Sequence, residues 1–122
     1  MQVHGREVGF LFTVGASVEI SELCPDGDLS RLGELLEGQY GKVTRDTATI
    51  IAALSEGYEQ AMAFEAPGYK PQSLTVDELL SLSFAEFGAL QAAALDAWRI
   101  GSATTVEVEP EKKENGEDRT SS

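Results

Sequence analysis

The sequence predicts a mainly α-helical protein in which a small N-terminal β-hairpin packs on a bundle of about four to six helices, followed by a disordered acidic tail. Apolar residues recur at helical spacing through most of the chain, strand-like alternation of large apolar residues marks the first thirteen residues, and the composition turns polar and acidic after Ile100. A chain of 122 residues has room for one modest core. We therefore predict one domain over residues 1–101, with the hairpin at 1–13, and a tail over 102–122.

The predicted hairpin has arms at residues 1–4 and 6–13 and turns at His4 and Gly5, where glycine accommodates the positive φ of a tight turn. Large apolar residues occupy alternate positions of the second arm: Val8, Phe10 and Phe12. An isolated two-stranded ribbon is only marginally stable in water. The apolar face is therefore expected to pack on helices or on another chain.

Two short helices are expected next. Thr13 is a candidate N-cap for a helix over residues 14–23, which Cys24 and Pro25 would end. Asp28 is a candidate N-cap for a helix over residues 29–37, which Gly38 would end. The second helix would bury Leu29, Leu32, Leu35 and Leu36.

The longest periodic segment predicts a central helix that starts near Gly41. Its inward positions would be Val43, Thr47, Ile50, Ile51, Leu54, Tyr58 and Met62. Gly57 interrupts the pattern at a cost of about 1 kcal/mol relative to alanine, so a kink and a break followed by a helix over 58–65 are both open. Prolines and glycine then predict a loop over residues 65–73, with Tyr69 exposed or folded back.

Two capping boxes organise residues 74–99. Thr75 with Glu78 and Ser83 with Glu86 each have the spacing in which hydroxyl and carboxylate satisfy backbone N–H groups reciprocally. They predict a short helix from Val76 and a long one over about 84–100. One side of the long helix carries Phe84, Phe87, Leu90, Gln91, Ala94, Leu95 and Trp98. This stripe is interpreted either as core or, near Trp98, as a surface for a partner.

The charge balance argues against some partners. The chain has 21 acidic and 9 basic residues, a formal net charge of −12 at pH 7 and a pI near 4.3. Such a chain is repelled by nucleic-acid phosphates and by anionic lipid surfaces, which bind clustered Lys and Arg. A helix-turn-helix reading of residues 74–99 gains no support, since its second helix has one basic residue, Arg99. We expect no nucleic-acid partner and no membrane partner.

The sequence offers little for catalysis. Cys24 is the single cysteine and His4 the single histidine, so neither a disulfide, a thiolate-rich metal cage nor a nucleophile beside a base can be assembled. Cys24 is interpreted as a small buried hydrophobe and His4 as a turn residue. Asp26 and Asp28 resemble a fragment of a calcium loop that lacks the further oxygen ligands. We predict no catalytic residue, no cofactor and no metal.

The order of these parts resembles the small tail assembly chaperones of long-tailed bacteriophages and related prophages. The resemblance lies in a strand pair of V-x-G-R-E-x-x-F-x-F-T character at residues 3–13, a helical body, the segment LTVDELLSLSFAEFGALQ at residues 74–91, and an acidic tail. It implies a non-enzymatic protein of the host bacterial cytoplasm. Such a protein is absent from the finished virion and keeps tape-measure and tail-tube subunits soluble during assembly.

The resemblance implies two further properties. Self-association is expected in this family. The ribosome also slips backward near the end of the gene in many members, and an A-rich run encoding Glu111, Lys112 and Lys113 is a candidate slip site. A Lys-Lys pair is also commonplace in a charged tail.

Two other functions stay open at this point. The chain could be an acidic DNA mimic that occupies a nucleic-acid-binding protein, or a structural adaptor retained in the particle. For a chaperone, the partner-binding surface is expected among large side chains beside loops or helix ends. The candidates are Tyr58, Met62, Phe64, Tyr69 and Trp98.

Overall fold

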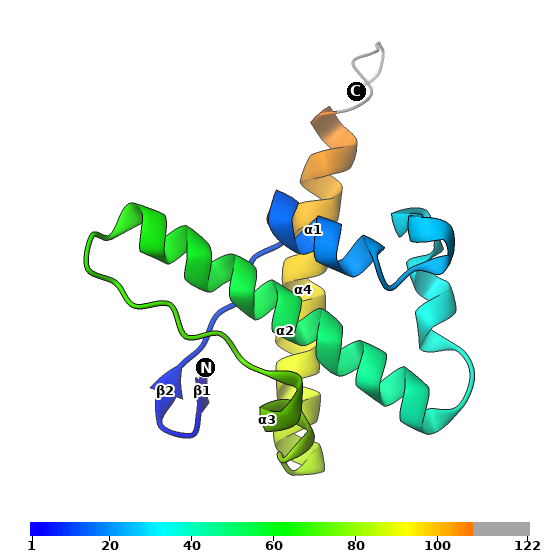
Figure 1. The fold of residues 1–122 in the computed structure, drawn as a ribbon, viewed down its shortest axis with the longest axis horizontal. Coiled ribbons are helices and arrows are strands. Elements are labelled where there is room, and N and C mark those ends of the chain that lie inside the picture. The colour runs from blue at the N-terminus through cyan, green and yellow to red at the C-terminus, as the bar shows by residue number, and fades with distance from the viewer. Residues whose placement is uncertain (109–122) are drawn as a thin grey trace.

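A computed structural model describes the backbone of residues 1–108 and the side chains of residues 1–101, and it confirms a mainly α-helical fold with an N-terminal hairpin (Figure 1). Strands β1 and β2 span Gln2–Val3 and Arg6–Glu7. The α-helices are α1 (Val14–Ser21), α2 (Tyr40–Glu65), α3 (Val76–Leu80) and α4 (Phe84–Val108). Two 3-10 helices, η1 (Pro25–Gly27) and η2 (Leu29–Leu36), join α1 to α2.

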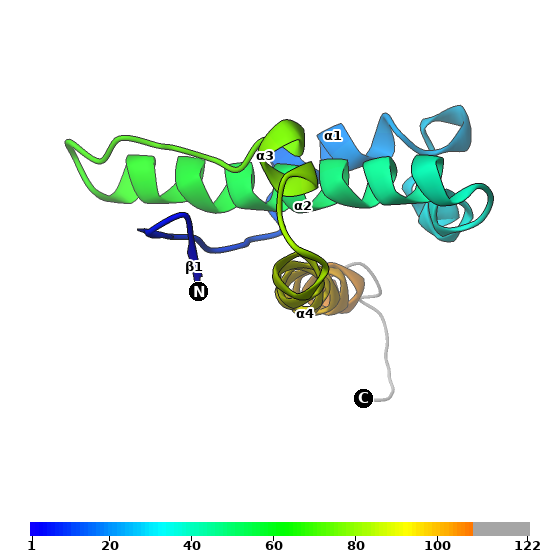
Figure 2. The ribbon, with the colours of Figure 1, turned by 90° about the horizontal axis from the view of Figure 1, so that it is seen from below.

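Helix α2 is the element on which the others pack. It contacts α1, α3, α4 and η2. In Figure 2, α4 is seen end-on beneath α2, while α1 and α3 lie at the level of α2, so the two longest helices cross steeply. The core fills the contacts around α2, and its largest fully buried apolar residues are Ile20, Ile51, Leu54, Leu79 and Leu90.

The hairpin turns where the sequence predicts, with φ of 51° at His4 and 80° at Gly5. It is shorter than predicted, because the antiparallel ladder pairs only Gln2 with Glu7 and Val3 with Arg6. Residues 8–13 instead run extended against the helices, and the Leu11 N–H donates to the Leu54 carbonyl at 3.0 Å. The predicted apolar face is confirmed, since Val8 is buried and Phe10 and Phe12 pack on the core.

Gly57 neither kinks nor breaks α2, which is continuous from Tyr40 to Glu65. A Cβ atom at position 57 would lie 2.6 Å from the Leu11 carbonyl oxygen and 2.9 Å from Thr13 Oγ1. The extended segment 8–13 crosses α2 at this point. Glycine is therefore the residue that permits the close crossing, and helix continuation on either side outweighs its low propensity.

The predicted caps before α1 and η2 are confirmed, although both helices end early. Thr13 Oγ1 accepts from the Ala16 N–H at 3.1 Å, and Asp28 accepts from the Ser30 N–H at 3.0 Å. Helix α1 ends at Ser21, and the predicted α-helix over 29–37 is the 3-10 helix η2. The tighter turn of a 3-10 helix rotates the apolar pattern. Leu35 is buried and Leu29 and Leu32 pack on the core, whereas Leu36 is half exposed, contrary to prediction.

Helix α4 extends further than the sequence predicts. The prediction ended it at about Ile100 and began a disordered tail at residue 102, but the helix continues to Val108. Residues 101–108 contain no proline, and adding a residue to an existing helix costs far less than nucleating one. The rest of the predicted tail, residues 109–122, lies outside the described residues, and so does the candidate slip site at 111–113.

A candidate partner-binding groove

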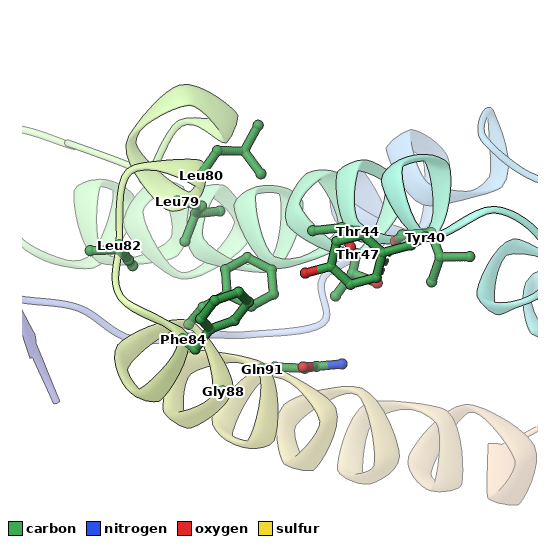
Figure 3. Close-up of a pocket in the computed structure, with 11 residues that line it drawn as sticks. Tyr40, Thr44, Thr47, Leu79, Leu80, Leu82, Phe84, Gly88 and Gln91 are labelled. Carbon is green, nitrogen blue, oxygen red and sulfur yellow. Dashed lines mark hydrogen bonds between the residues drawn. The ribbon is translucent and has the colours of Figure 1, made fainter.

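An apolar groove of about 640 Å³ opens between α2, α3 and α4 (Figure 3). Its lining residues are Tyr40, Val43, Thr44, Thr47, Leu79, Leu80, Leu82, Phe84, Phe87, Gly88 and Gln91. Figure 3 shows side chains of α2 above and of α4 below facing the space between the two helices, with Leu79 and Leu82 at the corner where α3 leads into α4.

The two long walls are helix faces of matching length. The α2 wall uses positions 40, 43, 44 and 47, and the α4 wall uses positions 84, 87, 88 and 91. Both sets follow the i, i+3, i+4, i+7 pattern of a single helix face over two turns. Because α4 crosses α2 steeply, the N-terminal halves of the two helices diverge from the crossing (Figures 1 and 2). The lining residues place the groove between these two halves.

The groove exposes aromatic surface. Phe84 is 87% exposed and Tyr40 is 72% exposed, while Leu80 on α3 is 39% exposed. Burying a large apolar side chain is favourable by about 1.5–3 kcal/mol, so a partner that covered the two rings would gain several kcal/mol before the costs of association. Scattered exposed apolar residues are normal, but these line one cavity.

The chemistry of the lining favours binding. Its members are aliphatic, aromatic, threonine, glycine and glutamine residues, with no ionisable side chain other than the Tyr40 phenol. Among the side chains of residues 1–101, no group of three or more His, Cys, Asp or Glu is arranged to hold a metal ion. Cys24 is buried and its Sγ lies 3.4 Å from the Ile20 carbonyl oxygen, and burial raises the pKa of its thiol. The groove can therefore make apolar contacts and a few neutral hydrogen bonds.

Helix α3 is held in place as a wall of the groove by the hairpin. Its own residue Leu79 is fully buried, and the Arg6 guanidinium donates to the carboxylate of its residue Glu78 at 2.7 and 3.1 Å. His4 Nδ1 lies 3.0 Å from the same carboxylate. The hydrogen bonds from Arg6 are the main cause that lowers the pKa of Glu78 to about 2. A helix of five residues has little stability of its own, so these contacts fix its position.

The two predicted capping boxes differ. Ser83 Oγ accepts from the Glu86 N–H at 3.2 Å and the Ser83 N–H donates to Glu86 at 3.3 Å, which confirms a reciprocal box at the start of α4. Thr75 Oγ1 accepts from the Glu78 N–H at 3.1 Å, which confirms half of the other box. The predicted return bond, in which the Thr75 N–H donates to the Glu78 carboxylate, is replaced by the bonds that Arg6 donates. A charged donor binds a carboxylate more strongly than a backbone amide does.

The five candidate residues from the sequence do not form one site. Trp98 packs against Phe12, with ring centroids 4.5 Å apart, and lines a separate cavity of about 70 Å³ between η2, α2 and α4. This smaller cavity shares Thr47 and Gln91 with the groove. Trp98 is therefore adjacent to the groove without lining it.

The other four candidates lie near the C-terminal end of α2. Tyr58 is half buried and packs against Gly9, and Met62 is half buried. Tyr69 folds back so that its hydroxyl donates to the buried carboxylate of Glu59 at 2.7 Å. Phe64 is 92% exposed and stands apart, since α2 separates it from Tyr40 by about 36 Å at 1.5 Å per residue.

The groove residues were visible in the sequence only as parts of apolar stripes. Phe84 was placed on the α4 stripe together with Leu90 and Ala94, which are buried, but the steep crossing of α2 and α4 covers only the middle of that stripe. A crossing angle is set by packing between elements and leaves no mark on the periodicity of either helix. Tyr40 precedes the predicted start of the central helix, so the helical periodicity does not indicate it.

Comparisons with protein-family models, with curated proteins and with solved structures each gave no match to this chain. Among the described residues, no helix combines the length and the apolar character needed to cross a membrane. The function is therefore inferred from the groove, its lining and the charge of the chain.

Proposed function

We propose that this protein is a bacteriophage tail assembly chaperone that acts in the host bacterial cytoplasm and is absent from the finished virion. It binds tape-measure subunits, tail-tube subunits or both while the tail polymerises, and releases them without making or breaking covalent bonds. The observation that carries this proposal is the open apolar groove between α2, α3 and α4, with Phe84 and Tyr40 exposed on its two walls.

The groove suits a protein that shields apolar surface. Subunits that later assemble expose the surfaces through which they will pack, and those surfaces aggregate if they are left uncovered. A groove lined by aliphatic and aromatic groups covers such a surface by the same apolar burial that drives its later assembly. Binding through apolar contact without a covalent step is also reversible, which a transient chaperone requires.

The charge of the chain supports the same role. A formal net charge of −12 on 122 residues makes each complex repel other complexes, which opposes aggregation while the partner is held. The groove itself has no charged lining residue, so apolar contact and electrostatic repulsion are supplied by different parts of the surface.

An acidic DNA mimic has less support. Such a mimic needs carboxylates free to replace phosphates, whereas many described carboxylates have local structural partners. Glu78 binds Arg6, Asp46 binds Lys42, and Asp28 caps η2. Burial leaves Glu59 inaccessible. No observation favours a structural adaptor over a chaperone, and the experiment below distinguishes them.

The proposal is tested by co-expression with the tape-measure and tail-tube proteins of the same phage or prophage genome. We expect a tape-measure protein that is insoluble alone to become soluble and to co-purify with this chain. Phe84→Ser should reduce the soluble yield, while Phe64→Ser, which removes an equally exposed ring far from the groove, should not. Mass spectrometry of purified virions should find no copy of the chain.

Two results would contradict the proposal. If neither tail protein is solubilised or co-purified, the partner is a different one. If the chain is present in stoichiometric amounts in purified virions, the structural adaptor is the correct function.

A further inference from the structure

The groove walls define the shape of what they bind. Each wall presents four residues over two helical turns, which gives a contact length of about 10 Å at 1.5 Å per residue. The corner between the walls is filled by Leu79 and Leu82, so an occupant enters from the open side that Phe84 and Tyr40 flank. The rows of side chains at i, i+3 and i+4 on such walls have the spacing at which the side-chain rows of a third helix pack between them.

The backbone of the walls argues against an extended occupant. The two long walls belong to α2 and α4, whose backbone groups are bonded within each helix over the lining positions. Strands β1 and β2 contribute no residue to the lining, so the groove offers no strand edge. An extended peptide would bury N–H and C=O groups without partners there, which is costly, whereas a helix arrives with its backbone already bonded.

The net charge of this protein determines which residues are favoured on the solvent-facing side of the occupant. Affinity in the groove comes from apolar contact, because the lining has no charged side chain. The field of a chain with net charge −12 speeds the approach of basic segments and opposes acidic ones. Charge complementarity therefore favours a partner helix whose solvent-facing side is basic.

We propose that the groove binds an amphipathic helix of two to three turns, with apolar residues at i, i+3, i+4 and i+7 and a basic outer face. This inference rests on the function proposed above, for which it names the recognised segment of the partner. Two turns of such a helix present about three to four apolar side chains. They would pack against Phe84, Phe87 and Tyr40.

The test uses four synthetic peptides of equal length and measures their binding to the full chain by calorimetry. The first has leucine at the helix-face positions and lysine elsewhere. The second has glutamate in place of lysine. The third contains the leucines and lysines in scrambled order, and the fourth is the first with two central prolines, which prevent a helix.

We expect the first peptide to bind and to gain helical circular dichroism when bound, and the other three to bind at least tenfold more weakly. Phe84→Ser should weaken the first peptide about tenfold, since the lost burial of one phenylalanine is worth about one factor of ten or more. Tyr40→Ser should weaken it in the same direction. Phe64→Ser is the matched control and should leave its Kd unchanged.

Each contrary result overturns a stated part of the inference. Equal binding of the proline peptide excludes a helical occupant, and equal or tighter binding of the glutamate peptide excludes charge selection. Equal binding of the scrambled peptide shows attraction by charge alone. Loss of affinity in Phe64→Ser but not in Phe84→Ser or Tyr40→Ser places the site elsewhere. All three residues are largely exposed, and unchanged thermal unfolding would verify that each variant folds.

The same measurements separate this inference from the proposed function. If tail proteins bind through Phe84 but the leucine-lysine helix does not, the chaperone function stands and the helical occupant is wrong. If the leucine-lysine helix binds through Phe84 but neither tail protein does, the groove has been assigned correctly and the tail partners are wrong.

Discussion

Glu78 on α3 and Arg6 on the hairpin form a paired hydrogen bond across 72 residues of sequence, at 2.7 and 3.1 Å. Both side chains are largely shielded, with 23% of Arg6 and 18% of Glu78 exposed. Planar guanidinium and carboxylate groups match in this geometry, which makes the contact stronger than a surface ion pair. The N-terminal hairpin thereby fixes the α3 wall of the groove.

Replacing Glu78 with glutamine should destabilise the fold. The neutral amide cannot accept both hydrogen bonds that Arg6 donates to the carboxylate. The partly buried guanidinium also loses its counter-charge. We expect the free energy of unfolding to fall by on the order of 2 kcal/mol, between the values typical of exposed and buried pairs. Urea unfolding at neutral pH measures this. Asp96→Asn, which removes the exposed pair with Arg99, should change little, and an equal loss in both variants would contradict the special role of Glu78.

The same pair predicts a dependence of stability on pH. The pKa of Glu78 is lowered from 4.5 to about 2 in the folded protein, mainly by the hydrogen bonds from Arg6. A carboxyl group with a lowered folded pKa contributes its stability above the unfolded pKa and loses it as the pH falls toward the folded value. The difference in unfolding free energy between wild type and Glu78→Gln should therefore be full at about pH 6 and shrink steadily below about pH 4.5. A difference that is constant down to pH 3 would exclude this linkage.

Gly57→Ala should be destabilising although alanine is the better helix former. The added Cβ would lie 2.6 Å from the Leu11 carbonyl oxygen, so segment 8–13 must move away from α2. We expect a loss of about 1–3 kcal/mol, typical of overpacking. Gly88→Ala is the matched control, because position 88 is exposed on α4 with nothing within 4 Å, and it should stabilise by about 0.5–1 kcal/mol. Thermal unfolding of both variants measures the contrast, and a stabilised Gly57→Ala would mean that the segment crosses elsewhere.

Most of the fold could be predicted from local signals. The turn at His4 and Gly5, the caps at Thr13, Asp28 and Ser83, and the order of the helices depend on residues close together in the chain. Such signals act through one or two hydrogen bonds or a single φ angle, which the sequence displays directly.

Several outcomes that the sequence did not predict depend on distant residues. Glu78 was expected to complete a capping box with Thr75, but Arg6 competes for its carboxylate from the hairpin. Gly57 was expected to weaken α2, but it accommodates a crossing segment that its neighbours in sequence do not reveal. The groove depends on the angle between α2 and α4, which periodicity does not reveal. Periodicity placed Phe84 on the apolar face of α4, but it did not show that α2 leaves this end of the face uncovered.

The sequence suggested Tyr69 as a partner-binding residue. We predict that it instead holds the loop after α2 in place. Its hydroxyl donates at 2.7 Å to Glu59, which is 3% exposed and also accepts from the Gln72 N–H at 3.0 Å. The hydrogen bond to Glu59 is the main cause that raises the pKa of Tyr69 to about 12. Tyr69→Phe removes one of the two donors of a buried carboxylate, so the Tm should fall by about 4–8 °C.

Three measurements check this role for Tyr69. Tyr40→Phe is the matched control, because Tyr40 is 72% exposed, and its Tm should stay at the wild-type value. In the folded wild-type protein, Tyr69 should ionise only near pH 12, because its tyrosinate would place a second negative charge beside Glu59. The absorbance of this tyrosinate should be missing from the pH titration of Tyr69→Phe. Binding of the leucine-lysine helix at 25 °C should be the same in Tyr69→Phe as in wild type. A variant with unchanged Tm and weakened peptide binding would instead place Tyr69 in the partner-binding surface.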